Sequence, residues 1–260
     1  MSGSPSILTK SFRVTSSDVD LWRRMRPSVL FRLVQEAAIA HTEALGMGRD
    51  KTLDRGILWI VTLQSAEIRR MPEYDDDLVL RSWPGETMHV LFPRYFALDT
   101  EAGEPLVRVS AIWTLLDAEK RTMVFPEKAG IHIDGGKTGD EIALPSPPRP
   151  VPFTDSADFT VPYSYVDLNG HMNNTRYFDL AEDLLPHAKD GRRLTRLSTE
   201  FAREIPLGET VSVRWGEENG RVYLAGLPAG AALPDANGPS AAGNGPAPKP
   251  SFRMSLTYEC

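Results

Sequence analysis

The chain has 260 residues, of which 41% are hydrophobic and 25% are charged, so it can bury a sizeable core and wholesale disorder is not expected. Its formal net charge of −6 argues against a nucleic-acid-binding protein, because such proteins neutralise phosphates with basic surfaces. The single cysteine, Cys260, excludes an internal disulfide and fits a reducing compartment. The N-terminus has no signal-peptide pattern and no apolar run approaches the roughly 20 residues that span a bilayer, so we expect a cytoplasmic protein without membrane insertion.

The first half of the chain predicts a strand, a long helix and an antiparallel meander. The strand is expected around Ser11–Val14. Pro27 is favourable at a first helical position, and apolar residues at helical spacing from Val29 to Ala38 predict a helix that ends by Gly46. From residue 57 the chain changes to β-type runs between turn signals. The strands expected there are Leu58–Arg70, Asp77–Trp83, Arg94–Leu98 and Leu106–Leu116.

The second half repeats this order after a linker. Residues 134–160 are rich in Gly, Pro and Ser and include PSPPRPVP, which predicts an extended linker between domains 1–133 and 161–260. A helix is expected from Thr175 to Leu185, with Pro186 ending it. Residues 228–250, dominated by Ala, Gly, Pro and Asn, predict a disordered loop. The strands expected around that loop are Leu194–Arg203, Thr210–Trp215, Arg221–Gly226 and Phe252–Tyr258.

The two halves share a phrase, which indicates a tandem duplication. Ser17–Leu33 and Ser164–Leu180, aligned without a gap at an offset of 147, are identical at seven of seventeen positions. Asp167 has a counterpart in Asp20, but the polar residues Asn169 and His171 correspond to Trp22 and Arg24. The second copy therefore holds groups suited to chemistry that the first copy lacks.

A second alignment, at an offset of 133, covers the strands that follow. Ser65, Glu67, Arg70 and Arg81 of the first half fall on Ser198, Glu200, Arg203 and Arg214 of the second. In this register Glu204 corresponds to Met71, so an additional acidic group also occurs only in the second copy. We expect an α+β protein in which each repeat packs a helix against an antiparallel sheet.

Asp167, Asn169 and His171 allow two interpretations. In the first, they form only a well-capped helix entry, since Asn-Gly favours a turn and Asp often satisfies local backbone donors. A calcium loop is disfavoured, because Gly170 follows Asn169 directly and histidine is a poor ligand for that ion. In the functional interpretation, the amides at the helix entry near residues 173–175 stabilise an oxyanion. His171 then takes part in hydrogen bonding or proton transfer, and Asn169 orients a water or a carbonyl.

Glu204 is the acid that would complete this set. Its alternative interpretation is an exposed glutamate paired with the neighbouring Arg203. The absence of a counterpart at Met71, together with the loss of the Asn and His from the same copy, favours a functional role. A partly desolvated glutamate can activate a water.

These residues carry a family resemblance. The phrase YSYVDLNGHMNNTRY, followed about thirty residues later by STEFAREI, resembles the acyl-acyl carrier protein thioesterases of bacteria and plants, over nearly the whole stretch from Ser11 to Tyr258. The resemblance implies a double hotdog fold, with a non-catalytic first domain that helps to form the acyl pocket and a catalytic second domain. It also implies a catalytic group formed by Asp167, Asn169, His171 and Glu204.

The resemblance further implies hydrolysis of a fatty acyl thioester of acyl carrier protein during fatty acid biosynthesis, without a metal or organic cofactor. Plant members carry a cysteine immediately after the glutamate, but this chain has Ile205. A Cys–His nucleophile is thereby excluded unless Cys260 folds back, so an activated water is expected to attack directly, with Glu204 or Asp167 as the base. The tandem repeat is compatible with a monomer or a homodimer.

Other functions remain open at this stage. The chain could be a hotdog acyl-CoA thioesterase, a hydratase or dehydratase, or a module that binds an acyl thioester without turnover. His89 and Pro93 weakly resemble the dehydratase branch of the hotdog superfamily, although His89 is expected on a strand. The basic cluster of Lys189, Arg192, Arg193 and Arg196 is expected to be a solvated face, with docking of an acidic carrier protein as the alternative.

Overall fold

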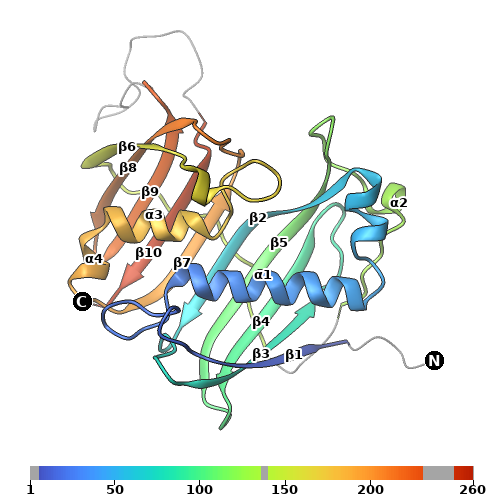
Figure 1. Ribbon diagram of the computed structural model, residues 1–260, viewed down its shortest axis with the longest axis horizontal. Helices are drawn as coiled ribbons and strands as arrows, with labels where there is room; N and C mark the ends of the chain where they lie inside the picture. The colour runs from blue at the N-terminus through green and yellow to red at the C-terminus, as the bar shows by residue number, and fades with distance from the viewer. Residues whose placement is uncertain (1–5, 136–139, 231–248, 260) are drawn as a thin grey trace. The chain divides into compact units, whose positions relative to one another are not determined.

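The chain divides into two compact units, Met1–Ser146 and Pro147–Cys260. The computed structural model describes residues 6–135, 140–230 and 249–259. The division lies within the stretch 134–160 that the sequence predicts to be a linker. Within the part of the chain that the model describes, no helix has the length and apolar character needed to cross a membrane. Each unit contains one principal helix and its own set of antiparallel strands (Figure 1).

The first unit is a five-stranded antiparallel layer with a long helix. Its strand order is β1-β3-β4-β5-β2, and every neighbouring pair is antiparallel. Short 3-10 turns at 49–51 and 53–55 connect the long helix to β2, and a four-residue helix follows β5. The elements are β1 (Leu8–Arg13), α1 (Pro27–Ala44), β2 (Ile57–Ile68), β3 (Asp77–Pro84), β4 (Phe92–Thr100), β5 (Pro105–Asp117) and α2 (Pro126–Ala129).

Helix α1 forms where the sequence predicts it, because Pro27 occupies the first helical position and apolar residues recur on one face. The helix lies across the strands of its unit (Figure 1). Its buried apolar side chains are Leu30, Phe31, Val34, Ala37 and Ala38. Complete burial of each of the three larger ones stabilises the fold by about 1.5–3 kcal/mol. Packing of this face therefore holds α1 on the sheet.

The second unit repeats the arrangement with a shorter helix. Its strand order is β7-β10-β9-β8-β6, again antiparallel throughout. Helix α3 ends at Leu184 because Leu185 precedes Pro186 and adopts an extended conformation, with ψ of 135°. The elements are β6 (Asp155–Thr160), α3 (Arg176–Leu184), α4 (Pro186–Lys189), β7 (Leu194–Phe201), β8 (Thr210–Glu218), β9 (Arg221–Pro228) and β10 (Phe252–Tyr258).

The structure corrects one sequence-based expectation for this unit, and another lies mostly outside the described residues. The predicted linker 134–160 is too long at its C-terminal end, because Asp155–Thr160 forms the edge strand β6 and pairs with β8. Its side chains are mostly exposed, so the segment lacks the apolar signal of a strand. The predicted disordered loop 228–250 lies mostly outside the described residues, which omit 231–248, and Cys260 lies outside them too.

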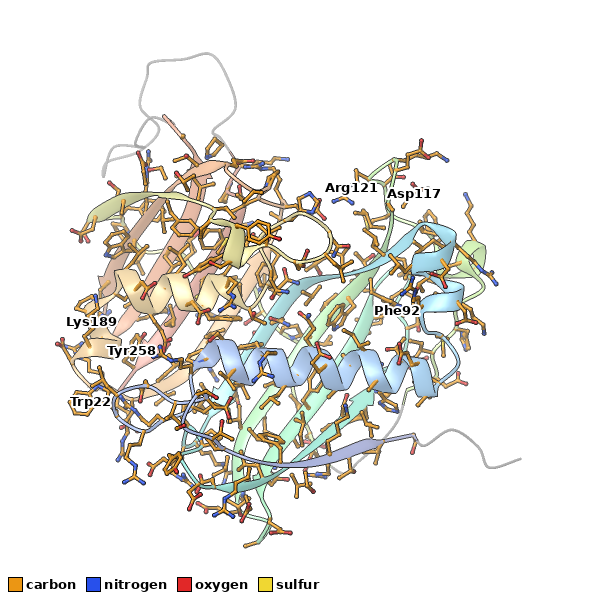
Figure 2. All side chains as sticks on the ribbon, viewed as in Figure 1. Trp22, Phe92, Asp117, Arg121, Lys189 and Tyr258 are labelled. Carbon is orange, nitrogen blue, oxygen red and sulfur yellow. The ribbon has the colours of Figure 1, made fainter. Side chains whose placement is uncertain are left out.

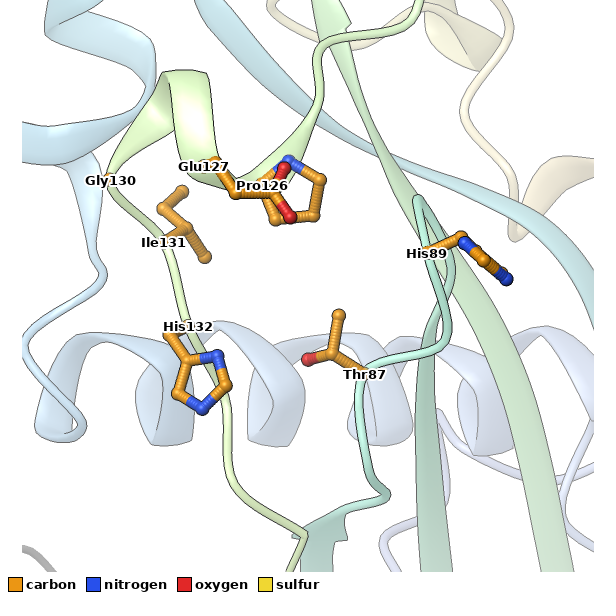
Figure 3. Close-up of a pocket in the computed structure, with 7 residues that line it drawn as sticks. All are labelled: Thr87, His89, Pro126, Glu127, Gly130, Ile131 and His132. Atoms are coloured by element: carbon orange, nitrogen blue, oxygen red, sulfur yellow. The ribbon is translucent and has the colours of Figure 1, made fainter.

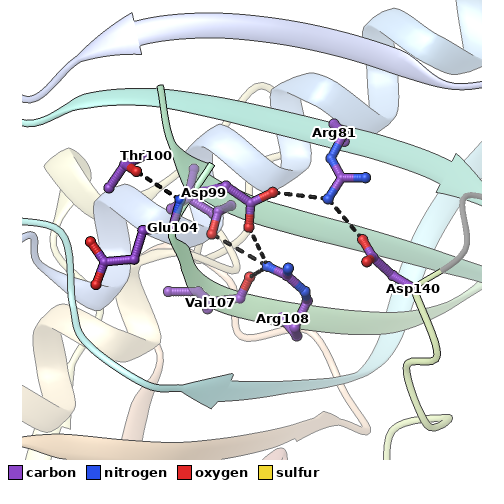
Figure 4. Close-up of polar contacts among 8 residues, drawn as sticks. Arg81, Asp99, Thr100, Glu104, Val107, Arg108 and Asp140 are labelled. Carbon is purple, nitrogen blue, oxygen red and sulfur yellow. Dashed lines mark hydrogen bonds and ion pairs between the residues drawn. The ribbon is translucent and has the colours of Figure 1, made fainter. Parts of the chain in front are cut away.

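An ion-pair network fastens part of the connecting segment to the first unit (Figure 4). Asp99 on β4 accepts hydrogen bonds from Arg81 at 2.8 Å and from Arg108 at 2.6 Å. Arg81 also donates to Asp140, which follows the last strand of the unit, at 2.8 Å. Because the Asp99 side chain is only 12% exposed, this charge is compensated by two cations rather than by water.

A second polar cluster lies inside the first unit, between α1 and the sheet. Arg94 is 4% exposed, and its guanidinium donates to His41 Nδ1 at 3.1 Å, to Ser82 at 3.3 Å and to Thr42 at 3.1 Å. Burial lowers the pKa of Arg94 to about 10, so the side chain still carries its charge at neutral pH. Since arginine only donates hydrogen bonds, His41 Nδ1 accepts one, and the His41 ring is held as the neutral Nε2–H tautomer.

Candidate active site

The predicted site begins with a tight turn from Asp167 to His171. The Asp167 amide donates to the carbonyl of His171 at 3.1 Å, and the Gly170 amide donates to the carbonyl of Asp167 at 3.0 Å. One carboxylate oxygen of Asp167 accepts the Asn169 amide at 2.8 Å. Gly170 has a φ of +80°, a left-handed conformation that glycine adopts without strain. Asp167 therefore organises the turn that presents His171.

The first unit contains the same turn without the same side chains. The Asp20 carboxylate accepts the Trp22 amide at 2.8 Å and the Arg24 amide at 2.9 Å. The Asp20 amide donates to the carbonyl of Arg24 at 2.8 Å. Arg23, which corresponds to Gly170, also has a left-handed conformation, with a φ of +65°. The duplication predicted from the sequence is thus preserved in the backbone hydrogen bonds.

Each turn is held by the connection that follows β2 in the first unit and β7 in the second. In the second unit, the Met172 amide donates to the carbonyl of Ile205 at 2.8 Å, and His171 forms a backbone bridge with Pro206. The first unit has the corresponding bond from Met25 to Pro72 at 2.7 Å, with a bridge between residues 24 and 73. Ile205 is fully buried and anchors this connection.

This pairing places His171 beside Glu204. The two atoms that approach one another, His171 Nδ1 and Glu204 Oε1, are 3.7 Å apart. The side chains are 25% and 34% exposed, so they are partly desolvated and still within reach of a ligand. The structure thus brings together two of the four residues expected to be catalytic. Asn169 lies two residues before His171 and is exposed, and Asp167 is joined to both through the turn.

The Arg203 guanidinium binds the carboxylate of Glu209 rather than that of its sequence neighbour Glu204. Its guanidinium donates to both carboxylate oxygens of Glu209, one of them at 3.0 Å, and to the Ser251 hydroxyl at 2.9 Å. The bond from Arg203 lowers the pKa of Glu209 below its ordinary value. Arg70 and Asp76 form the corresponding pair in the first unit at 3.0 Å. This ion pair belongs to the shared frame of the two repeats, whereas Glu204 belongs to the second copy alone.

Among the amides of residues 173–175, which were predicted to bind an oxyanion, one is left as a donor at the entry of α3. The Asn173 amide donates to the carbonyl of Tyr165, and the Thr175 amide to the side-chain oxygen of Asn173, each at 2.9 Å. Both of these predicted donors are therefore used within the protein. In the part of the chain that the structure describes, the Asn174 amide has no such acceptor, so it is the donor available at the predicted oxyanion position.

Tyr177 is a residue that the sequence analysis did not single out. It is 2% exposed and its ring packs edge-on against Phe201 and Phe252, with centroids 5.3 and 4.8 Å away. Burial raises the pKa of its phenol above the ordinary value, and the Asp167 carboxylate adds a smaller effect in the same direction. Its counterpart at the offset of 147 is Leu30, so the copy-to-copy comparison that found His171 would also have found Tyr177.

His89 does not lie on a strand, contrary to expectation. It occupies a turn between Met88 and Leu91, which form a bridge, and its φ is +54°. With Thr87, Glu127 and His132 it lines a surface pocket of about 390 Å³ in the first unit (Figure 3). Among the described residues, no group of three or more His, Cys, Asp or Glu side chains is arranged to hold a metal ion.

Two family models match the chain. Residues 5–127 match the acyl-ACP thioesterase N-terminal domain, and residues 152–224 match the acyl-ACP thioesterase C-terminal domain. An acyl-[acyl-carrier-protein] hydrolase, chloroplastic FATB3 of Cuphea viscosissima, is 22% identical over 223 residues, which cover 75% of this chain and 51% of that protein. A chloroplastic dodecanoyl-[acyl-carrier-protein] hydrolase of Cinnamomum camphora is 24% identical over 218 residues, covering 77% and 57%. The chain thus spans little more than half the length of these relatives.

Solved structures show the same fold. An acyl-ACP thioesterase from Bacteroides thetaiotaomicron superposes with a TM-score of 0.82 at 19% identity, and the match covers 100% of both chains. The 12:0-ACP thioesterase from Umbellularia californica superposes with a TM-score of 0.77 at 16% identity over 98% of each chain. The α+β double hotdog fold expected from the sequence is therefore confirmed.

Proposed function

The chain belongs to the acyl-ACP thioesterase family, and from this premise we propose that it hydrolyses fatty acyl thioesters of acyl carrier protein to the free fatty acid and the carrier thiol. The observation that carries the proposal is the distance of 3.7 Å between His171 Nδ1 and Glu204 Oε1. The corresponding positions of the first unit hold neither a histidine nor a glutamate. The proposed place of the reaction is fatty acid biosynthesis.

Glu204 is the proposed general base. Asp167 is less suited to this role, because one of its carboxylate oxygens already accepts the Asn169 amide, and Asp20 has the same bond in the copy that lacks the histidine. A carboxylate at the position of Glu204, two-thirds buried beside an imidazole, can take a proton from water. Asp167 then acts mainly by holding the turn.

The proposed reaction proceeds in two steps. Glu204 removes a proton from a water held by His171 and Asn169, and the water oxygen bonds to the thioester carbon. The carbonyl oxygen becomes an oxyanion that the Asn174 amide and the entry of α3 stabilise. The carbon–sulfur bond then breaks, and the proton held by Glu204 returns to the leaving thiolate.

The chemistry of Ile205 supports direct attack by water. This residue follows Glu204, is fully buried, and has no nucleophilic group. A covalent acyl intermediate on the adjacent side chain is therefore excluded. Within the proposal, the second unit supplies the reacting groups, which are His171 and Glu204.

The decisive assay measures thiol release from acyl carrier protein thioesters of 8 to 18 carbons, with the coenzyme A thioesters of the same acids in parallel. The parent is expected to release thiol from the carrier substrates, and His171→Ala and Glu204→Gln are expected to lose that activity while remaining folded. No thiol release from any substrate, or enoyl formation without thiol release, would refute hydrolysis. Stoichiometric binding without turnover would identify a binding module instead.

A further inference from the structure

The second unit carries large exposed apolar side chains beside the candidate active site. Leu168, in the turn that presents His171, is 85% exposed, and Leu207, next to Pro206, is 50% exposed. The two leucines lie on adjoining backbone, because the Leu207 amide donates to the carbonyl of Gly170 at 3.3 Å. We call Leu168 and Leu207 the apolar knob.

The position of the knob is fixed by the same contacts that place the candidate catalytic pair. Leu168 lies three residues before His171, and Leu207 three residues after Glu204. The backbone bridge between His171 and Pro206 joins the two segments. A protein that brings a thioester to this pair can therefore contact the knob through the same two segments.

The shape of the knob indicates what can cover it. Small molecules bind in concave sites that enclose most of their surface, whereas a leucine that is 85% exposed projects into solvent. Such a side chain becomes buried only when a partner presents a complementary apolar depression, as protein partners do around their central contact residues. A protein ligand therefore fits the knob better than a free acyl chain or a small thiol.

A different surface was the other candidate for carrier binding. The basic cluster near α4 includes Arg192 and Arg193, which line a pocket of about 560 Å³. Asp190, Glu217 and Glu259 line the same pocket, and Arg192 pairs with Glu217 at 3.5 Å. The nearby Lys189 (Figure 2) donates to a backbone carbonyl at 3.0 Å. Because acidic groups balance this cluster, charge complementarity does not favour it as the docking surface.

We propose that the apolar knob of Leu168 and Leu207 is the contact through which the carrier protein docks when it delivers the thioester to His171 and Glu204. This inference rests on the proposed function. It makes the two leucines specificity-determining residues that favour a carrier-bound substrate over a free thioester. Their contribution lies in binding the carrier, and the chemical step does not depend on them.

The chain supplies a matched control. Leu21 occupies the position of Leu168 in the first unit and is 74% exposed, and Tyr74 occupies that of Leu207 and is 41% exposed. The first-unit turn holds neither the histidine nor the glutamate. Substitution of Leu21 therefore tests whether loss of any exposed leucine at such a turn is enough to produce an effect.

The test compares Leu168→Ser, Leu207→Ser, their double variant and the control Leu21→Ser. Two substrates with the same dodecanoyl group are used, one on acyl carrier protein and one on N-acetylcysteamine, which has no carrier. We expect KM for the carrier substrate to rise about tenfold in the double variant, which corresponds to losing part of the burial energy of two leucines. The values of kcat, KM for the small substrate, and both constants of Leu21→Ser should stay within twofold of the parent.

Other results overturn the inference in distinct ways. An unchanged KM for the carrier substrate means that the knob does not contact the carrier. An equal rise for both substrates means that the leucines hold the acyl group or its arm, and a fall in kcat means that they support the site itself. A change in oligomeric state on gel filtration assigns the knob to a second copy of the chain.

Failure of the proposed function would be recognised separately. If the parent hydrolyses neither substrate, the thioesterase proposal fails. Docking is then measured directly, by titrating the parent and the double variant with unacylated carrier protein. A dissociation constant that is the same for both proteins, or no binding by the parent, refutes the docking proposal without reference to turnover.

Discussion

His171 Nδ1 lies 3.7 Å from Glu204 Oε1, and the corresponding positions of the first unit hold Arg24 and Met71. The backbone that brings these positions together is common to both units, since the Met172–Ile205 bond has its equivalent in Met25–Pro72. The chemical difference between the units therefore lies in side chains presented by a shared frame. Several outcomes of substitution follow from this relationship.

Replacing either member of the pair should abolish most hydrolysis. Because general base catalysis contributes about 10²–10⁴-fold, Glu204→Gln is expected to lower kcat by that range with little change in KM. His171→Ala should act similarly. Thiol-release kinetics measure both, and Glu101→Gln, at the exposed β4–β5 hairpin tip, is the control. Rates for Glu204→Gln within twofold of the parent, in a folded protein, would exclude it as the base.

Asp167 and Asp20 should both contribute to stability but differ in their effect on activity. The Asp167 carboxylate accepts one backbone amide and the Asp20 carboxylate accepts two, so Asp167→Ala should lower the free energy of unfolding by about 1 kcal/mol and Asp20→Ala by about 2 kcal/mol. Asp167→Asn keeps an acceptor oxygen and should retain most of the stability. Urea unfolding and kcat are measured together. If Asp167→Asn is as inactive as Glu204→Gln, the carboxylate has a chemical role beyond the turn.

The buried Arg94 cluster makes a prediction about the first unit. His41→Leu removes an acceptor from a buried cation, and the free energy of unfolding should fall by about 2 kcal/mol. The control is His132→Leu, because the His132 side chain is 80% exposed and pairs with Asp134 at the surface. That variant should change stability by less than about 0.5 kcal/mol. Equal effects in denaturant unfolding would show that Arg94 does not depend on His41.

The Arg203–Glu209 ion pair predicts a pH dependence of stability. The pKa of Glu209 is lower in the folded protein than its ordinary value of 4.5, so the ionised form stabilises the fold above that pH, and the stabilisation is lost as pH falls through the folded pKa. Glu209→Gln should therefore unfold more easily than the parent at pH 7, by at most about 1 kcal/mol because the pair is partly exposed. The difference should shrink towards pH 3. A difference that is constant across this range would contradict the assignment.

The sequence predicted the elements whose signals are local. Pro27 and the apolar face behind it specify α1, and Pro186 specifies the end of α3. Strand β6 was missed because its side chains are mostly exposed, and its pairing with β8 depends on residues 50 to 60 positions away. The prediction that His89 lies on a strand was wrong because the β-type residues around it form a turn. His89 has a left-handed backbone conformation within that turn.

The sequence predicted those residues of the candidate site that differ between the two halves of the chain. That comparison separated Asn169, His171 and Glu204 from the shared scaffold, and the structure brings His171 and Glu204 together. It could not show that Arg203 binds Glu209. In the sequence the adjacent opposite charges suggest a pair between Arg203 and Glu204, and only the folded turn brings Glu209 close to Arg203. Nor could it show which amide at the helix entry lacks an acceptor, since that depends on the bonds of every neighbouring amide.

The left-handed turn of residues 20–24 has a practical value. Arg23 keeps the backbone conformation that Gly170 adopts in the second unit, although a side chain makes that conformation less favourable. The turn of residues 20–24 is thus an internal control for the turn of residues 167–171, because both are present in the same molecule at the same concentration, ionic strength and temperature. Hydrogen exchange or chemical-shift changes on adding substrate can be read as the difference between residues 167–171 and residues 20–24. No second preparation is needed for that subtraction.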